Sequence, residues 1–338
     1  MDTVTPEIKL ISRAVELPGC WDIIADDYYQ TIEFLNYTER YNPCRQRYYV
    51  LFLDGVFKTG MVVYTLKLDL LTFMSIPSPF AMNIAGIPCS VSSGGIIGDR
   101  EFVQMLIGYI KSVEKGLLLI LNVEEGLKIK NMVSGKTLPT ILFTRQFESW
   151  DEYLSSLRAA YRRRIRFIAD SFSGICKKQT DCSCFDVEMY RQYLEVLQRS
   201  KGKLETLPME FFLNLPSNFT LHTFYNREKL IGWYITTSFR GKFYFFLGGI
   251  DYKVNKLFDT YFNILLAVLL DGIAMKVSAI DLGQTAEIPK IRLGGNLVEK
   301  KMMAYHSNRI IREFLKAGKR WLEYTTTVEG MHVFKERK

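Results

Sequence analysis

The stretch Asp281–Gly295, DLGQTAEIPKIRLGG, follows a short apolar run and combines a lysine, an arginine and three glycines. The apolar run Val277–Leu282 predicts a strand, so this stretch begins where a strand ends. Glycine permits close approach of a ligand to the backbone, and it equally serves turns. Both uses therefore stay open for Gly283, Gly294 and Gly295.

Polar side chains in this stretch make it a candidate binding site. If the segment is extended, Lys290 and Arg292 reach the same face, where they could bind an anion. A solvated lysine and a surface arginine are the alternatives. Gln284 and Thr285 offer hydrogen bonds to a substrate directly after the strand, although Thr285 could instead cap a helix.

The elements before this stretch indicate the fold class. Leu257–Ala274 is apolar almost all round, which predicts a buried helix. Three strands are predicted before it, the last two joined by a hairpin at Arg240-Gly241: Thr220–Tyr225, Leu230–Phe239 and Lys242–Ile250. Antiparallel strands followed by a helix and one more strand favour a mixed α/β sandwich over a doubly wound sheet. Neither GxGxxG nor GxxxxGK[ST] is present in the sequence.

The first half repeats the order of strands, helix and strand. Asp54-Gly55 predicts a hairpin between two strands. Asp99 is placed to cap a helix. The predicted elements are the strands Arg47–Leu53, Val56–Leu66, Ile84–Ser90 and Leu117–Asn122 and the helix Arg100–Glu114. The 338 residues therefore suggest two domains, 1–148 and 149–338.

An arginine cluster follows this boundary. Trp150–Phe172 predicts one helix with an apolar stripe. Within nine of its residues lie five arginines with no acid among them: Arg158, Arg162, Arg163, Arg164 and Arg166. Like charges so close repel, and a donor phosphate, a tRNA backbone or anionic lipid would relieve the repulsion. Carboxylates of neighbouring elements are the alternative partners. A further helix is predicted over Asn308–Tyr324.

Composition limits the class of protein. The formal net charge of +8 favours anionic partners without choosing among them. No apolar run reaches the roughly 20 residues that a membrane span needs, and the N-terminus does not resemble a secretory signal, so we expect a cytoplasmic protein. Six scattered cysteines without CxxC predict free thiols and no metal site.

The second half resembles the GNAT domain of Fem-type and BioF-like acyltransferases. The resemblance lies in the Leu230–Gly249 hairpin, the helix with Asp259, Tyr261 and Asn263, the sequence Asp281-Leu282-Gly283-x-Thr285, and the pair Lys290 and Gly294. In the first half, Ile84–Pro88 and the glycine loop Ser92–Asp99 are similar to the family's first domain. Two features depart from the pattern: Pro289 replaces an aromatic residue, and the [QR]-x-x-G-x-[GA] phosphate loop is absent.

The resemblance implies tandem GNAT-like domains of α/β (α+β) class, each with a mixed, largely antiparallel sheet flanked by helices. It implies transfer of an acyl or aminoacyl group to a small-molecule or peptide amine without a covalent enzyme intermediate. Acyl-CoA or aminoacyl-tRNA would be a co-substrate, and no permanently bound cofactor is expected. Lys290 would stabilise charge, and Tyr261 is a candidate general acid. The implied donor-binding residues are Arg158, Arg162, Arg166, Gly283, Gln284, Thr285, Arg292, Gly294 and Gly295.

Two alternatives stay open. One is a Fem-like ligase that uses aminoacyl-tRNA to modify a peptide or precursor, which the arginine cluster favours. The other is a non-catalytic binding protein that has kept the fold, which Pro289 and the missing phosphate loop favour.

Overall fold

The computed structural model describes residues 5–42, 44–67, 81–89, 91–200, 205–325, 328 and 331–336. The chain forms two compact units, each built from several segments. Unit 1 comprises Met1–Leu138, Gly202–Pro208 and Glu299–Thr325, and unit 2 comprises Pro139–Lys201, Met209–Val298 and Thr326–Lys338. The boundary predicted between residues 148 and 149 falls inside unit 2. Ser90, the predicted end of a strand, lies outside the described residues.

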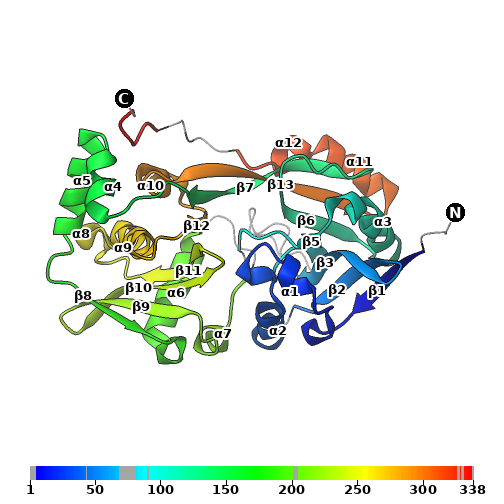
Figure 1. The fold of residues 1–338 in the computed structure, drawn as a ribbon, viewed down its shortest axis with the longest axis horizontal. Helices are drawn as coiled ribbons and strands as arrows, with labels where there is room; N and C mark the ends of the chain where they lie inside the picture. The colour runs from blue at the N-terminus through cyan, green and yellow to red at the C-terminus, as the bar shows by residue number, and fades with distance from the viewer. Residues whose placement is uncertain are drawn as a thin grey trace. The chain divides into compact units, whose positions relative to one another are not determined.

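Unit 1 is a mixed sheet with helices against it (Figure 1). Its strands are β1 (Pro6–Ile11), β2 (Arg47–Leu53), β3 (Val56–Lys67), β4 (Ala81–Ala85), β5 (Ile96–Gly98) and β6 (Leu117–Val123). Its helices are α1 (Trp21–Ile24), α2 (Ile32–Tyr41), α3 (Val103–Val113), α11 (Arg309–Ala317) and α12 (Lys319–Leu322), with 3-10 turns η1 (Ala14–Glu16), η2 (Tyr28–Gln30) and η3 (Arg100–Phe102).

Unit 2 has the same construction. Its strands are β8 (Cys176–Thr180), β9 (Thr220–Asn226), β10 (Lys229–Phe239), β11 (Lys242–Ile250) and β12 (Ala279–Gln284). Its helices are α4 (Trp150–Ser156), α5 (Ala159–Asp170), α6 (Val187–Arg199), α7 (Met209–Leu213), α8 (Asn255–Phe258), α9 (Thr260–Ala274) and α10 (Glu287–Arg292), with the 3-10 turn η4 (Cys182–Cys184).

The two sheets share one topology. In unit 1, β1 to β4 are antiparallel neighbours, β4 pairs in parallel with β6, and α3 connects those two strands. In unit 2, β8 to β11 are antiparallel neighbours, β11 pairs in parallel with β12, and α9 connects those two strands. The predicted tandem fold, with a mixed, largely antiparallel sheet in each domain, is confirmed.

The last strand of each sheet comes from the other half of the sequence. β7 (Val133–Phe143) follows β6 in the chain, yet its second half pairs with β12 in unit 2. β13 (Asn296–His306) follows β12 in the chain, yet it pairs with β6 in unit 1. This exchange of strands explains why each unit contains segments from both halves.

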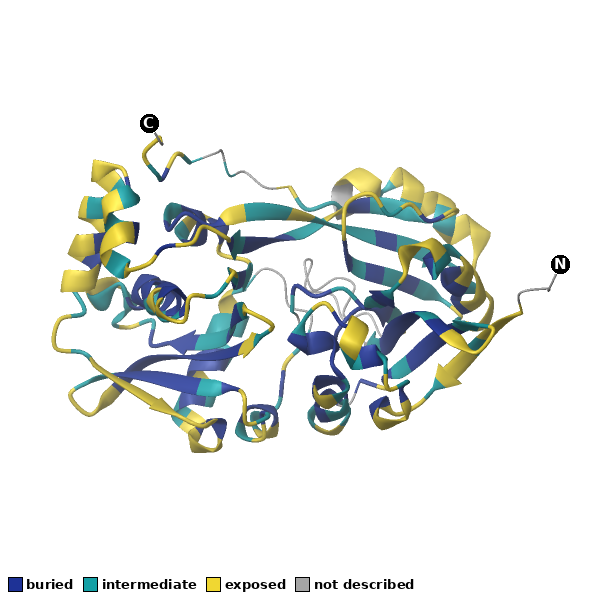
Figure 2. Ribbon diagram, in the orientation of Figure 1, coloured by how far each residue is buried: buried dark blue, intermediate teal, exposed yellow. Residues whose placement is uncertain are grey.

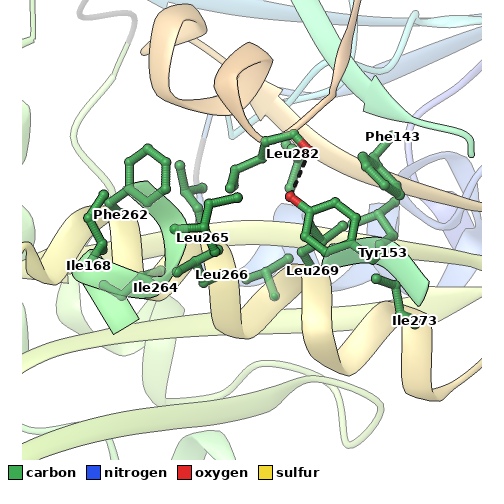
Figure 3. Packing of buried hydrophobic residues seen from close by; sticks show 14 of the residues in the cluster. Phe143, Tyr153, Ile168, Phe262, Ile264, Leu265, Leu266, Leu269, Ile273 and Leu282 are labelled. Atoms are coloured by element: carbon green, nitrogen blue, oxygen red, sulfur yellow. Dashed lines mark hydrogen bonds between the residues drawn. The ribbon is translucent and has the colours of Figure 1, made fainter. Parts of the chain in front are cut away.

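The helix α9 forms the centre of the hydrophobic core of unit 2. Leu265 and Leu269 are fully buried, as the apolar composition of the helix predicted, and they pack with Leu282 of β12 (Figure 3). The Tyr153 hydroxyl donates a hydrogen bond of 3.0 Å to the Leu293 carbonyl, which joins α4 to the end of α10. The core therefore fixes the segment that contains the candidate site.

The prediction of a single helix over Trp150–Phe172 is wrong. Leu157 and Arg158 adopt extended conformations that separate α4 from α5. Leu157 forms a β-bridge with Phe334, and the Arg158 N–H donates to the Val333 carbonyl at 3.0 Å. This pairing with the C-terminal segment replaces helical hydrogen bonds, so Arg158 precedes α5 and does not lie on its surface.

We expect Leu265→Ala to lower the free energy of unfolding by about 2–5 kcal/mol, because it removes fully buried methyl groups and leaves a cavity. Leu257→Ala, at an exposed position of α8, is the matched control and should change it by less than about 0.5 kcal/mol. Urea denaturation followed by circular dichroism measures both. Equal losses for the two variants would contradict the placement of α9 in the core.

Candidate functional site

The parallel pairing of β11 and β12 ends early. The two strands are paired from Lys242 and Ala279 to Tyr244 and Asp281. Beyond these pairs β11 continues to Ile250 beside β10, whereas β12 continues beside β7. The facing edges of the two strands therefore separate, and beyond these pairs β11 and β12 no longer hydrogen-bond to each other.

A constrained turn follows β12. Gly283, Thr285 and Ala286 have φ angles of 73°, 61° and 47°. Positive φ is uncommon for residues other than glycine, and such conformations concentrate at functional sites. The Asp281 carboxylate holds the start of the turn, because its Oδ1 accepts hydrogen bonds from the Gly283 N–H at 2.7 Å and from the Thr140 hydroxyl at 3.2 Å.

Lys290 fixes this turn from the other side. It lies on α10, and its Nζ donates hydrogen bonds to the carbonyls of Gln284 at 2.8 Å and Gly283 at 3.2 Å. The residue is 2% exposed, so the alternative of a solvated lysine is wrong. Pro289 occupies the first turn of α10, where a missing N–H costs nothing because it would have no partner in the helix.

Burial changes the protonation of Lys290. Loss of hydration lowers the pKa of its ammonium to about 7, although the carboxylates of Asp281 and Glu287 favour the charged form. Glu287 is itself buried and lies one helical turn before Lys290. Glu287 is not among the site residues predicted from the sequence, because it shares a face with Lys290 only in a helix and no helix is predicted there. A predicted helix would have placed the two side chains on one face.

Gly283 lies between the lysine and the separated strands. A Cβ atom at Gly283 would lie 3.8 Å from the Phe245 carbonyl oxygen of β11 and 3.9 Å from the Lys290 Nζ. The ammonium therefore lies beside the point where β11 and β12 separate. The structure brings Lys290, Gly283 and Gln284 together, and their roles in a site stay predictions.

The segment is helical, so the extended conformation in which Arg292 would share a face with Lys290 is not formed. Residues two apart on a helix point about 200° apart, and α10 includes both of them. Gly294 and Gly295 serve close packing: a Cβ at Gly294 would meet the Phe334 ring at 2.3 Å, and one at Gly295 would meet Ile141 at 2.5 Å. Donor binding by Arg292, Gly294 and Gly295 remains a prediction, and none of the contacts in the described part of the chain supports it.

A separate open cavity of about 540 Å³ lies next to Gly294. The Arg145 guanidinium lies over the Phe334 ring, 4.0 Å from its centroid, at the edge of this cavity. The lining residues are Thr144, Arg145, Gln146, Gly294, Asn296 and Phe334.

Tyr261 lies at the start of α9 and packs against the core of unit 2. Burial raises the pKa of its phenol, which makes it a weaker acid. Within the described residues no hydrogen bond connects Tyr261 to Lys290. The structure therefore adds no support to its predicted role as a general acid.

The arginine cluster presents exposed cations on α5. Arg163, Arg164 and Arg166 are exposed, and Arg162 donates a hydrogen bond of 3.2 Å to the Leu157 carbonyl. None of these four pairs with a carboxylate in the part of the chain that the structure describes. Arg158 lies 3.8 Å from Glu336, so it fits the alternative of pairing with neighbouring carboxylates.

In unit 1 the corresponding strands are covered by a loop. β4 is paired with β6 from Asn83 to Ala85, where β4 ends. The Asn122 side chain of β6 donates to the carbonyls of Val91 and Ser93, and a Cβ at Gly95 would lie 2.4 Å from the Gly86 nitrogen. The loop 91–95 therefore lies against the ends of both strands.

Comparisons of structure identify the fold. FemX aligns with 80% of this chain and 90% of its own length, at a TM-score of 0.50 and 11% identity. A tandem GNAT protein from the clavulanic acid biosynthesis pathway aligns with 89% of this chain and 99% of its own length, at a TM-score of 0.51 and 9% identity. The chain has the fold of tandem GNAT proteins. Comparisons of the sequence with family models and with curated proteins found no match.

No helix in the described residues is long and apolar enough to span a bilayer.

The low pKa of Lys290 makes the stability of the protein depend on pH. Between about pH 7 and pH 10 the unfolded chain holds a proton on Lys290 that the folded chain has released. Stability therefore rises with pH in this range, by at most about 1.4 kcal/mol per pH unit. We expect Lys290→Met to remove this dependence.

Urea titrations at several pH values measure the effect, with the difference between wild type and variant as the readout. Lys276→Met is the control, because Lys276 is exposed and pairs with Glu148 at the surface. A difference between wild type and Lys290→Met that stays constant from pH 7 to pH 10 would show that the ammonium is not desolvated.

Proposed function

We propose that the chain is an N-acyltransferase that transfers an acyl or aminoacyl group from an activated donor to an amine at the separation of β11 and β12. The observation that carries this proposal is that separation, with the Lys290 ammonium beside it. The tandem GNAT fold supports it as the setting in which such a site is expected.

The chemistry requires no covalent intermediate. The amine nitrogen attacks the carbonyl carbon of the donor, the new C–N bond forms, and the C–S or C–O bond to the carrier breaks. The carrier leaves as a thiol or a hydroxyl with the proton that the amine gives up. N–H groups at the separated edges would stabilise the oxyanion, because donors fixed before the reaction need no reorganisation.

Lys290 contributes in two ways under this proposal. Its hydrogen bonds to Gly283 and Gln284 hold the turn after β12, so the backbone beside the donor keeps one geometry. Its ammonium also supplies positive charge in a site with little water, where charge acts more strongly than in solution. With a pKa of about 7, part of the population is charged at neutral pH.

We expect Lys290→Met to lower kcat/KM for acyl transfer by about 100-fold, the usual effect of losing one group that stabilises the oxyanion. The measurement is amide formation with a panel of amines and either acyl-CoA or aminoacyl-tRNA. Lys276→Met, an exposed lysine on the same unit, should retain full activity.

Two results would overturn the proposal. One is the absence of product from wild type with both donor classes. The other is full activity of a folded Lys290→Met protein, which would leave the non-catalytic binding role as the better description.

The arginine cluster on α5 favours aminoacyl-tRNA as the donor. Four guanidinium groups without carboxylate partners in the described residues attract phosphates, and an RNA backbone presents phosphates at regular intervals. Phe167 lies exposed among them and offers a ring on which a base can stack. This assignment of the donor is a proposal that the transfer reaction itself does not require.

We expect Arg163→Gln/Arg164→Gln/Arg166→Gln to weaken tRNA binding and to reduce the slope of log K against log salt by about 2, at roughly 0.7 per phosphate contact. Filter binding at several salt concentrations measures the slope. The control Lys136→Gln/Arg191→Gln/Lys276→Gln removes the same charge from cations that already pair with carboxylates. Equal slopes for both variants, or activity that resists ribonuclease, would exclude tRNA.

A further inference from the structure

Helix α11 directs large apolar side chains away from the protein. Ile310 is 67% exposed and Phe314 is 72% exposed, and no residue of the helix is buried (Figure 2). An ordinary surface helix turns its apolar stripe toward the core. The amphipathic character of α11 therefore has a different cause from packing within unit 1.

The contacts of α11 with its own unit are made by other side chains. The Arg312 guanidinium lies over the Tyr305 ring of β13, 5.1 Å from its centroid, and Leu315 is half-buried. Ile310, Ile311 and Phe314 lie within about 100° of one another around the helix, on a different side from Arg312. The helix thus contacts unit 1 through the side that contains Arg312 and Leu315 and leaves its other, apolar face in solvent.

The same segment is basic. Arg309 to Glu323 contains five cations and two acids, a net charge of +3. Each acid has a lysine neighbour: Glu313 lies 2.9 Å from Lys316, and Glu323 lies 3.5 Å from Lys319. The cations without a carboxylate partner in the described residues are Arg309, Arg312 and Arg320.

We propose that α11, with Arg320 after it, forms a docking surface for an anionic lipid bilayer, with Ile310 and Phe314 inserted among the headgroups. An amphipathic helix with cations beside its apolar face binds at the membrane interface and lies in its plane. Arg309 and Arg320 then bind lipid phosphates, which supply the missing negative charge. A helix this short gives reversible binding.

Charge argues against a second copy of the chain as the occupant. A symmetric dimer places the same patch on both partners, so the unpaired arginines of one copy would approach those of the other. A bilayer that contains anionic lipid provides both an apolar layer and negative charge. The proposal does not depend on the transfer reaction, because α11 belongs to unit 1 and the candidate site belongs to unit 2.

The test is co-sedimentation of the full chain with lipid vesicles. We expect binding to phosphatidylcholine vesicles that contain about 30% phosphatidylglycerol, and little binding to phosphatidylcholine alone. Ile310→Ser/Phe314→Ser should weaken binding at least about tenfold. The matched control is Val15→Ser/Ile23→Ser, which changes two residues of unit 1 that are 56% and 73% exposed and lie outside α11.

A charge variant separates the two parts of the proposal. Arg309→Gln/Arg320→Gln should weaken binding to the anionic vesicles, whereas Arg227→Gln/Lys253→Gln, with the same change in net charge, should not. Equal effects of test and control variants would overturn the proposal, as would equal binding to neutral vesicles. A concentration-dependent dimer that Ile310→Ser/Phe314→Ser dissociates, without vesicle binding, would assign the surface to a second copy.

Discussion

The rest of unit 2 depends on a limit to strand pairing: β11 and β12 are parallel neighbours over three residue pairs and then separate. A parallel pair requires a crossover connection, and α9 provides it as a helix buried on one face of the sheet. Because α9 fills that face of the sheet, a ligand can approach the backbone at the separation only from another side. The turn at Gly283 and the helix α10 border this position.

The turn and the lysine stabilise each other. Positive φ angles at Thr285 and Ala286 carry strain that the surroundings must compensate. The hydrogen bonds from Lys290 to Gly283 and Gln284 offset part of it, and the buried carboxylate of Glu287 offsets part of the charge of the lysine. A group held in this way is positioned before any substrate arrives. This positioning has a cost, because burial lowers the pKa of Lys290 and so favours its neutral form near neutral pH.

Much of the fold was predictable because it rests on local patterns. The hairpins at Asp54-Gly55 and Arg240-Gly241 followed from turn residues with positive φ, and α9 followed from its apolar composition. The failures have different causes. The break at Leu157 results from pairing with Phe334, far along the chain, and α10 was missed because Pro289 gave no local signal of a helix. Lys290 was found through resemblance, but its burial required the structure.

The exchange of β7 and β13 has a consequence for synthesis of the chain. When the ribosome has made the first half, the sheet of unit 1 still lacks its last strand, because β13 lies near the other end. Chains fold as they emerge from the ribosome, N-terminal parts first. The edge of β6 in unit 1 therefore stays unpaired until β13 has been synthesised. Its closure depends on contacts between residues about 180 apart in sequence, which is slow by topology alone. An unpaired strand edge of this kind also promotes aggregation. We therefore expect this chain to depend on chaperones during translation.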